Sequence, residues 1–169
     1  MNENGVEEVW LAVYTKPRHE KTADEQLREK GIKTYLPLVK KLRFWKDRKK
    51  WVWMPLFNSY LFVHIPLNHA LYVLQTIGVH HIVKFKGEYA IVPSEQVEAV
   101  RQILEGGFIP DPHDFFDIGE EVEVIGGPLR GVRGTLSRKD TDQRFVLHVD
   151  GIQQAISVKI DSNMIKPVK

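Results

Sequence analysis

The stretch that decides the fold of this chain is PLFNSYLFVHI, residues 55–65. From Tyr60 to Ile65 it is aromatic, β-branched and apolar, and only His64 interrupts the run. This composition predicts a strand that is buried, or nearly buried, on both faces of a sheet. Pro55 and Pro66 mark its two ends, because proline cannot donate a hydrogen bond to a neighbouring strand.

The segment just before this strand is the most basic in the chain. Seven lysines and arginines lie between Lys40 and Lys50, where Asp47 is the only acid. Apolar residues alternate with charged ones on both sides of a polar turn at 46–49, namely Leu42, Phe44, Trp51 and Trp53. This period of two predicts an extended hairpin with one apolar face and one basic face.

The chain that precedes the hairpin predicts a strand, a helix and a second strand. Residues 9–14 are an apolar, partly β-branched run that favours a strand. Residues 18–30 are rich in helix formers, and Gly31 stands where a helix C-cap is expected. Residues 32–39 have the composition of another strand.

Two more helices and a strand are predicted between residues 67 and 107. A short helix over 67–77 has apolar residues at helical spacing, namely Leu67, Leu71 and Leu74. A strand follows at 79–85, and a helix then begins at Ser94 as N-cap and ends at Gly106-Gly107. Residues 1–107 therefore predict an α+β sandwich, with helices packed against an antiparallel sheet.

The amino-acid composition changes at residues 108–116, where prolines, aspartates and a histidine predict a linker. Beyond it, five short strands separated by glycine turns are expected within residues 117–169. This spacing is typical of a small β-barrel. We therefore expect two domains joined by the linker.

Composition excludes several classes of protein. The chain has no cysteine, so disulfides, thiol catalysis and the common structural zinc sites are ruled out. No apolar run approaches the roughly 20 residues that span a bilayer, and the acidic N-terminus does not resemble a signal peptide. The net charge of +2 divides into +4 for residues 1–110 and −2 for the remainder. We expect a cytoplasmic protein without a membrane partner.

No arrangement of residues in the sequence indicates catalysis. His80 and His81 are adjacent, so in a strand they should point to opposite faces and not share a metal. Glu20, Asp24 and Glu95 fit a solvated helix surface. A nucleophile motif, a Walker loop and a dinucleotide fingerprint are all missing. We therefore expect neither a cofactor, nor a metal, nor enzymatic activity.

The strongest local motif is VEVIGGPLRGVRGT, residues 122–135. A strand runs into a Gly-Gly-Pro turn, and Gly131 and Gly134 interrupt the return strand. These glycines allow positive φ angles and a close approach of two backbones. The segment resembles the KOW motif of SH3-like barrels, although any small barrel of this kind can use such a turn.

The chain from Val9 to Lys169 resembles the NusG family of transcription factors, in which this kind of first domain accompanies a KOW domain. The matching residues are Trp10, Tyr14, the stretch 55–65 and Gly78-Val79. Housekeeping members usually have Phe-Pro-Gly-Tyr where this chain has Phe57-Asn58-Ser59-Tyr60. That difference, with Ile-Val-Pro-Ser at 91–94, is more similar to specialised paralogues such as RfaH and the regulators of polysaccharide operons.

The resemblance implies a non-enzymatic, monomeric factor that binds RNA polymerase during elongation and promotes antitermination of particular operons. In this family an aromatic pocket binds the clamp helices of the β′ subunit, and aromatic anchors dominate such interfaces. The positions that carry over are Trp10, Tyr14, Pro55, Tyr60, Phe62 and Phe85. These rings would also suit an ordinary core, and for Phe62 both interpretations stay open. His69 lies where specialised members contact the gate loop of the β subunit.

The basic hairpin is a candidate for nucleic-acid binding through Lys46, Arg48, Lys49 and Lys50. Contact of about four cations with phosphates would give log K a slope of roughly −3 against log salt. The interleaved aromatic residues would stack on exposed bases. A solvated hairpin with its aromatic side chains packed underneath is an equal alternative. In specialised relatives the non-template DNA strand is read near the start of the first helix, which implies Lys16, Arg18 and His19.

In this family the C-terminal barrel recruits ribosomal protein S10 or the termination factor Rho. Leu129 and Ile152 are apolar residues in expected loops, so we predict that they form this contact. The glycine turns and alternating Val and Ile favour a permanent β fold over the helical form known in one relative. A rival interpretation is an RNA-binding ribosomal or translation protein, because KOW barrels occur there too. A nucleic-acid-modifying enzyme is a more distant alternative.

Overall fold

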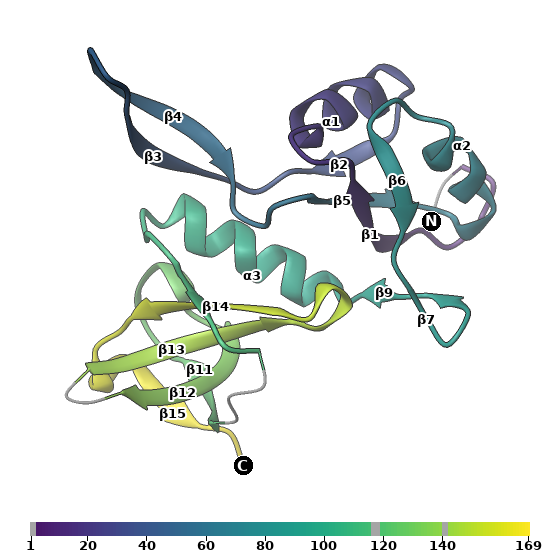
Figure 1. Ribbon diagram of the computed structural model, residues 1–169. Helices are drawn as coiled ribbons and strands as arrows, with labels where there is room; N and C mark the ends of the chain where they lie inside the picture. The colour runs from purple at the N-terminus through teal and green to yellow at the C-terminus, as the bar shows by residue number, and fades with distance from the viewer. Residues whose placement is uncertain (1–2, 116–118, 140–141) are drawn as a thin grey trace. The chain divides into compact units, whose positions relative to one another are not determined.

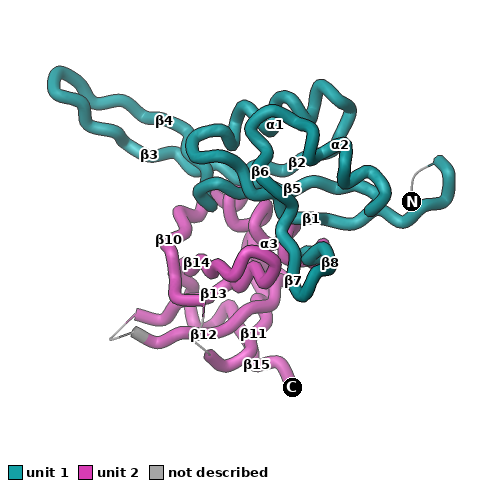
Figure 2. Tube along the Cα trace, turned by 45° about the vertical axis from the view of Figure 1, so that its right-hand side comes forward, with its two compact units in different colours: residues 1–92 teal, residues 93–169 magenta. Residues whose placement is uncertain are grey.

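The computed structural model describes residues 3–115, 119–139 and 142–169. The chain divides into two compact units, Met1–Val92 and Pro93–Lys169, which are coloured separately in Figure 2. Every strand pairing within the described residues is antiparallel. The protein therefore has a mixed α/β fold with antiparallel sheets and few helices, as the sequence predicts.

The first unit is built on a sheet whose strand order is β2-β5-β1-β6, with β9 also paired to β1 (Figure 1). The strands are β1 (Val9–Thr15), β2 (Lys33–Tyr35), β5 (Tyr60–Ile65), β6 (Val79–Ile82) and β9 (Ile91–Val92). Strand β5 has a partner on each side, and four of its six residues are buried. The prediction of a buried interior strand at this position is confirmed.

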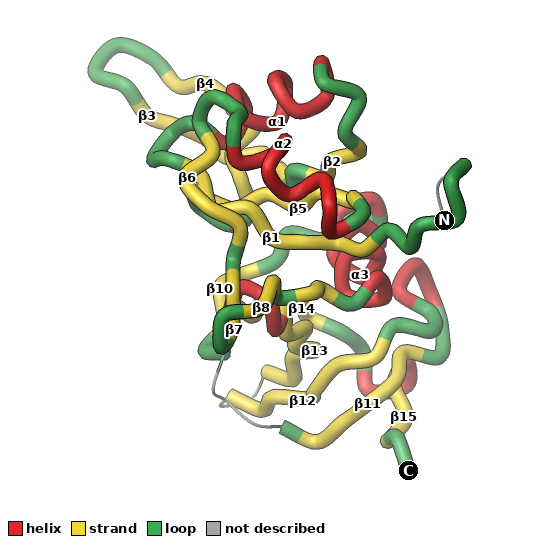
Figure 3. The backbone as a smooth tube through the Cα atoms, turned by 90° about the vertical axis from the view of Figure 1, so that its right-hand side faces the viewer, coloured by secondary structure: helices red, strands yellow, loops and turns green. Residues whose placement is uncertain are grey.

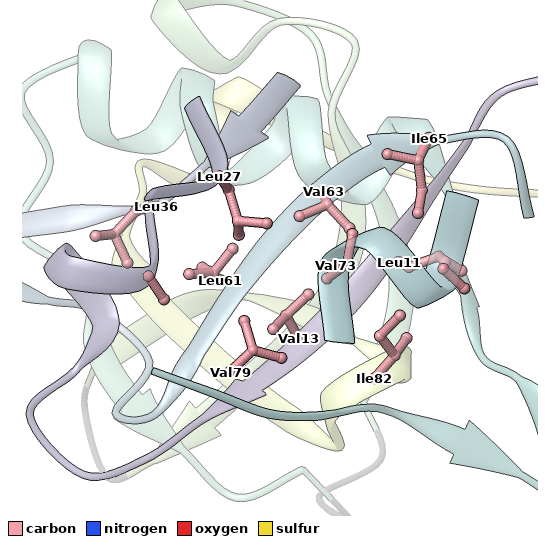
Figure 4. Packing of buried hydrophobic residues seen from close by; sticks show 12 residues of the cluster. Leu11, Val13, Leu27, Leu36, Leu61, Val63, Ile65, Val73, Val79 and Ile82 are labelled. Atoms are coloured by element: carbon pink, nitrogen blue, oxygen red, sulfur yellow. The ribbon is translucent and has the colours of Figure 1, made fainter. Parts of the chain in front are cut away.

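Helices α1 (Glu20–Glu29) and α2 (Ala70–Leu74) cover one face of this sheet, and the short 3-10 helix η1 (Leu67–His69) leads into α2 (Figure 3). Figure 4 shows Leu27 of α1 and Val73 of α2 pointing toward the aliphatic side chains of the strands. Those strand residues are Leu11, Val13, Leu61, Val63 and Ile65. Apolar burial of this kind supplies most of the stability of a short helix.

The helix around α2 is correctly predicted, but its buried side is not. Leu67, Leu71 and Leu74 share a side of the helix and are exposed, whereas Ala70 and Val73 enter the core. Helical spacing identifies residues that share a side, but it does not say which side meets the sheet.

Between β2 and β5 the chain forms a separate two-stranded hairpin, β3 (Leu38–Phe44) and β4 (Lys49–Pro55). It extends away from the sheet of the first unit (Figures 1 and 2). Its base is closed by the Leu56 amide, which donates to the Pro37 carbonyl at 2.8 Å. The predicted hairpin is therefore confirmed. A second, very short hairpin joins β7 (Lys84–Phe85) to β8 (Glu88–Tyr89).

The second unit contains helix α3 (Ser94–Glu105) and a six-stranded sheet. The strand order of the sheet is β10 (Asp111–His113), β14 (Gln154–Lys159), β13 (Asp142–Val149), β12 (Arg133–Lys139), β11 (Glu120–Val124) and β15 (Ile165–Pro167). Single turns of 3-10 helix are present at η2 (Gly127–Leu129), η3 (Asp150–Ile152) and η4 (Ser162–Met164). The five strands expected after the linker are all present, while their assignment to an SH3-like barrel stays a prediction.

Helix α3 belongs to the same compact unit as the second sheet, whereas the predicted first domain, residues 1–107, includes this helix. Helix α3 contacts η2 and β13. Within the predicted linker, residues 111–113 form β10 and pair with β14, while residue 116 lies outside the described residues. The N-cap of α3 is Pro93 and not Ser94, which is the first helical residue and makes no capping hydrogen bond through its side chain.

Gly134 shows why the motif at residues 122–135 needs glycine. A Cβ atom at this position would lie 2.3 Å from the Val146 carbonyl oxygen and 2.6 Å from the Phe145 ring. Gly127 and Gly131 have φ angles of +74° and +86°. The predicted roles of positive φ and close backbone approach are therefore confirmed. In the described ranges no helix is both long and apolar enough to cross a bilayer.

Candidate functional site

The sheet face opposite the aliphatic core gathers several of the predicted aromatic residues. Because side chains alternate along a strand, Trp10, Ala12 and Tyr14 share this face of β1. Their direct partners on β5 are His64, Phe62 and Tyr60. The structure thus brings together Trp10, Tyr14, Tyr60 and Phe62, which were predicted from separate parts of the sequence.

At one end of this face, four rings form what we call the tyrosine–histidine cluster: Tyr14, Tyr60, His80 and His81. The Tyr14 and Tyr60 rings meet edge to face with centroids 5.2 Å apart, and the His81 ring lies 5.0 Å from Tyr14. Both tyrosines are half-buried. Burial and the neighbouring Tyr14 raise the pKa of Tyr60, so its hydroxyl stays protonated and available as a donor near neutral pH.

A β-bulge places both histidines in this cluster. Tyr14 pairs with His81 but Thr15 pairs with Val79, so His80 has no partner in the register. The two imidazole rings are 4.9 Å apart, and their Nδ1 atoms lie 2.7 Å from each other. The expectation that they point to opposite faces was wrong, because it assumed a regular strand.

The two histidines form a hydrogen-bonded pair. One Nδ1 donates to the other, and burial together with His80 lowers the pKa of His81. Among the described residues, no group of three or more histidines and carboxylates is arranged to hold a metal ion.

A pocket of about 400 Å³ adjoins the cluster through His81. Its other lining residues are Leu74, Ile82, Lys84 and Tyr89. The Lys84 ammonium lies 4.9 Å from the centre of the Tyr89 ring. The cluster is therefore bordered by a concave surface that is partly apolar, a form suited to holding a side chain of a partner.

The other predicted residues on this face are buried. Phe62 is 0% exposed and lies near Phe57 and Tyr35, at ring distances of 6.4 and 6.5 Å. Trp10 is also buried and contacts His64 at 4.9 Å. These contacts favour the core interpretation that the sequence left open for Phe62.

Burial determines the protonation state of His64, which lies beside Trp10 on this face of the sheet. Its ring lies 3.2 Å from the Glu8 carboxylate, which raises its pKa, but burial and Lys33 outweigh that effect and lower it. The residue is therefore favoured as a neutral imidazole beside Trp10.

Three predicted polymerase-binding residues lie outside the cluster. Phe85 is 64% exposed on β7, with the Lys86 ammonium 5.5 Å from its ring centre. Pro55 ends β4 and is half-buried, and His69 is exposed at the junction of η1 and α2.

Glu20 holds the open end of the cluster in place. Its carboxylate accepts a hydrogen bond from the Ser59 amide at 2.8 Å, while the Thr15 amide donates to the Ser59 carbonyl at 2.8 Å. Glu20 is buried, so the expectation that it belongs to a solvated helix surface was wrong. These bonds join the residues that directly follow Tyr14 and precede Tyr60, and they fix the two strand ends.

The predicted DNA-binding residues surround the start of α1. Lys16 and Arg18 are exposed, and the His19 ring hydrogen-bonds the Pro17 carbonyl at 2.9 Å. The Lys21 ammonium in the first turn of α1 donates to the Trp53 carbonyl at 2.6 Å. This bond connects α1 to strand β4, so the cations at the start of α1 and those of the basic hairpin belong to neighbouring elements.

The aromatic side chains of the hairpin are exposed and do not pack underneath it. Phe44, Trp45, Trp51 and Trp53 expose between 48% and 67% of their surface. The register places Phe44, Trp51 and Trp53 on one face, but Lys49 and Lys40 lie opposite them on that same face. The prediction of separate apolar and basic faces is therefore only partly correct.

The two loop residues predicted to bind a C-terminal partner are buried. Leu129 is 1% exposed in η2, which contacts α3, and Ile152 in η3 is also buried. The Gln96 side chain on α3 bonds both the carboxylate and the amide of Asp150 in η3. Both residues are core side chains, because tertiary packing turns their 3-10 turns inward.

A pocket of about 390 Å³, which no local sequence pattern indicates, lies beside η2. Its lining residues come from the turn at 126–129, from residues 142–143, from the segment 159–164 and from Phe108.

Comparison with known proteins agrees with this architecture. Residues 8–101 match the family model described as "Transcription termination factor nusG". Among solved structures, NusG of Thermotoga maritima aligns over 96% of this chain and 98% of its own, with 17% identity and a TM-score of 0.53. The MjSpt4:Spt5 complex in conformation B aligns over 95% of this chain and 97% of its own, with 17% identity and a TM-score of 0.28.

The likeness to the Thermotoga maritima protein shows a shared fold, and the family model matches more than half of the 169 residues. This protein therefore belongs to the NusG family of transcription factors.

Proposed function

We propose that this protein is a non-enzymatic elongation factor that binds RNA polymerase through the tyrosine–histidine cluster and promotes antitermination. The observation that carries the proposal is the Tyr14–Tyr60 pair, which is half-buried and held by Glu20 and Ser59. The cluster that contains this pair adjoins, through His81, a pocket of about 400 Å³.

The proposed partner is the pair of clamp helices of the β′ subunit. A helical partner offers apolar side chains at regular spacing, and rigid aromatic anchors gain binding energy from them with little loss of conformational freedom. The hydrogen-bonded strand ends fix the rings before binding, which lowers the entropy cost of association. No step of this function needs a cofactor or a bond-breaking reaction.

Further contacts complete the proposal. The exposed Lys16 and Arg18, with His19, are proposed to meet the non-template DNA strand, and His69 the gate loop of the β subunit. The second unit is proposed to bind ribosomal protein S10 or Rho by a surface other than the buried Leu129 and Ile152. We propose action in the cytoplasm, as a monomer, on particular operons.

The test is binding of the 169-residue protein to reconstituted elongation complexes that contain an exposed non-template strand. Tyr60→Ala should weaken binding by about 2 kcal/mol, or about 30-fold, as expected for a hot-spot residue. Tyr60→Phe keeps the ring and should lose much less. Tyr72→Ala is the matched control, because Tyr72 is an exposed tyrosine on α2 outside the cluster.

Equal binding by the wild type and Tyr60→Ala would overturn the proposed site. A protein that ignores polymerase but binds RNA with steep salt dependence would instead belong with ribosomal RNA-binding proteins.

A further inference from the structure

The β3–β4 hairpin displays rings and cations together on what we call the aromatic hairpin face: Lys40, Leu42, Phe44, Lys49, Trp51 and Trp53. Opposed residues of an antiparallel pair share a face, and here Leu42 opposes Trp51, Lys40 opposes Trp53 and Phe44 opposes Lys49. The Lys40 ammonium lies 5.8 Å from the centre of the Trp51 ring, and that of Lys49 lies 5.3 Å from the centre of the Phe44 ring. Beyond the strand end, the Arg48 guanidinium lies 5.7 Å from the Trp45 ring centre.

The positive charge of the hairpin is not neutralised within the described part of the chain. None of the seven cations between Lys40 and Lys50 forms an ion pair with a described residue. Instead, lysines and an arginine lie over ring faces that are themselves open to solvent. A surface that has exposed rings together with cations outside ion pairs is suited to a partner that offers both aromatic faces and negative charge.

We propose that the aromatic hairpin face binds single-stranded nucleic acid, with bases stacked on Trp51 and Trp53 and phosphates held by the hairpin cations. Stacking of a base on an indole is stronger than a cation–π contact at an exposed site. A base can therefore displace the Lys40 ammonium from Trp51, and the released cation then pairs with a phosphate. Trp51 would exchange its contact with Lys40 for a stacked base, and Lys40 would exchange its contact with the ring for a phosphate.

The geometry favours a single strand over a duplex. Trp51 and Trp53 are two residues apart on one strand, so their Cα atoms are about 7 Å apart. Successive bases of an extended strand can each reach one ring, whereas the bases of a duplex are stacked and offer only their edges. A two-stranded β-ribbon can enter the major groove, but it reads base edges with polar side chains. This face carries rings instead.

The surface continues from the hairpin toward the first helix. Lys21 of α1 donates to the Trp53 carbonyl, and the exposed Lys16 and Arg18 precede it by a few residues. A strand lying on Trp53 therefore has further cations beside it. This inference deepens the proposed function, because an elongation factor on polymerase meets exposed single strands, but its test needs no polymerase.

The experiment measures the fluorescence anisotropy of labelled single-stranded DNA, single-stranded RNA and duplex DNA, each about 20 nucleotides long, with the 169-residue protein at about 50 to 300 mM salt, a range over which screening increases. We expect tighter binding to the single strands than to the duplex, and the comparison of single-stranded DNA with single-stranded RNA shows which of the two nucleic acids is preferred. Trp51→Ala/Trp53→Ala should weaken single-strand binding by about tenfold for each ring lost. Tyr72→Ala is the matched control, since Tyr72 is exposed and has the Lys30 ammonium 5.2 Å from its ring.

Charge is tested separately with Lys40→Gln/Lys49→Gln, which removes the two lysines of the aromatic hairpin face, and the slope of log K against log salt should become shallower by about 1.4. The control Lys166→Gln/Lys169→Gln removes two exposed cations of the second unit and should leave the slope unchanged. Equal affinity of the wild type and the double tryptophan variant, or tighter binding to the duplex, overturns the proposal. Because Tyr60 is intact in every variant, failure here is distinguishable from failure of the proposed polymerase site.

Discussion

Replacement of Phe62 by alanine tests whether this residue is a core side chain or part of a binding surface. Phe62 is 0% exposed, and the rings of Phe57 and Tyr35 lie near it. Removing a fully buried phenyl ring loses its transfer free energy and leaves a cavity, and such changes cost about 3–5 kcal/mol. We therefore expect Phe62→Ala to lower the free energy of unfolding by about 4 kcal/mol. Total stabilities of about 5–15 kcal/mol make this a large loss.

The assay is urea unfolding followed by tryptophan fluorescence. All four tryptophans of the chain, at positions 10, 45, 51 and 53, lie in the first unit, so the signal reports that unit alone. Trp10 is buried and pairs with His64 on the strand that carries Phe62, so its emission should change when the sheet unfolds. An unchanged m value would show that the variant unfolds from the same kind of folded state.

Phe85→Ala is the matched control, because Phe85 is also a phenylalanine of the first unit but is 64% exposed. We expect its effect on stability to stay within about 0.5 kcal/mol. A loss below about 1 kcal/mol for Phe62→Ala would refute the argument, since a ring that is truly enclosed cannot be removed so cheaply. Phe62 would then return to the candidate polymerase-binding residues.

Three further predictions concern the second unit and the histidine pair. Gly134→Ala should lower the free energy of unfolding by about 3 kcal/mol, because the added methyl group would overlap the Val146 carbonyl. Gly131→Ala should lower it by about 1 kcal/mol, because the added methyl group has space and only the φ angle of +86° is unfavourable for alanine. Both values are measured by denaturant unfolding followed by circular dichroism. Leu129→Ala should cost about 2–5 kcal/mol in the same assay, and a change below about 0.5 kcal/mol would show that Leu129 is a surface residue after all. Because the pKa of His81 is lowered in the folded protein, the unfolded state binds more protons than the folded state once the pH falls below about 6.5. The free energy of unfolding should therefore decrease as the pH falls below that value. His81→Gln should reduce this decrease in urea titrations at pH 7.5 and 5.5, and an identical pH dependence in both proteins would contradict it.

Local patterns in the sequence were sufficient for most of the secondary structure. The apolar run at 60–65 became β5, and the alternation around the basic turn became the β3–β4 hairpin. These features depend on neighbours within a few residues, where side-chain period and turn composition act directly. Tyr14 and Tyr60 were grouped only by the family resemblance, and the register of β1 against β5 places them opposite each other.

Features that depend on distant residues were predicted less well. The bulge that brings His80 beside His81 arises from the pairing of β6 with β1, and the residues around position 80 contain no pattern that predicts it. The burial of Glu20 depends on Ser59, and that of Leu129 on the packing of α3 over η2. A polar residue on a helix or an apolar residue in a turn is judged exposed until its tertiary partner is known.

The hairpin also has a consequence for how this protein can diverge. Strands β2 and β5 pair directly with each other, and the chain leaves and re-enters the sheet at Pro37 and Leu56, whose backbone groups are hydrogen-bonded. The segment between them contributes few residues to the aliphatic core, and lengthening such an excursion costs little closure entropy. Its length and side chains can thus change without disturbing the sheet. Substitutions in the hairpin can therefore alter its ligand preference without loss of the ability to fold.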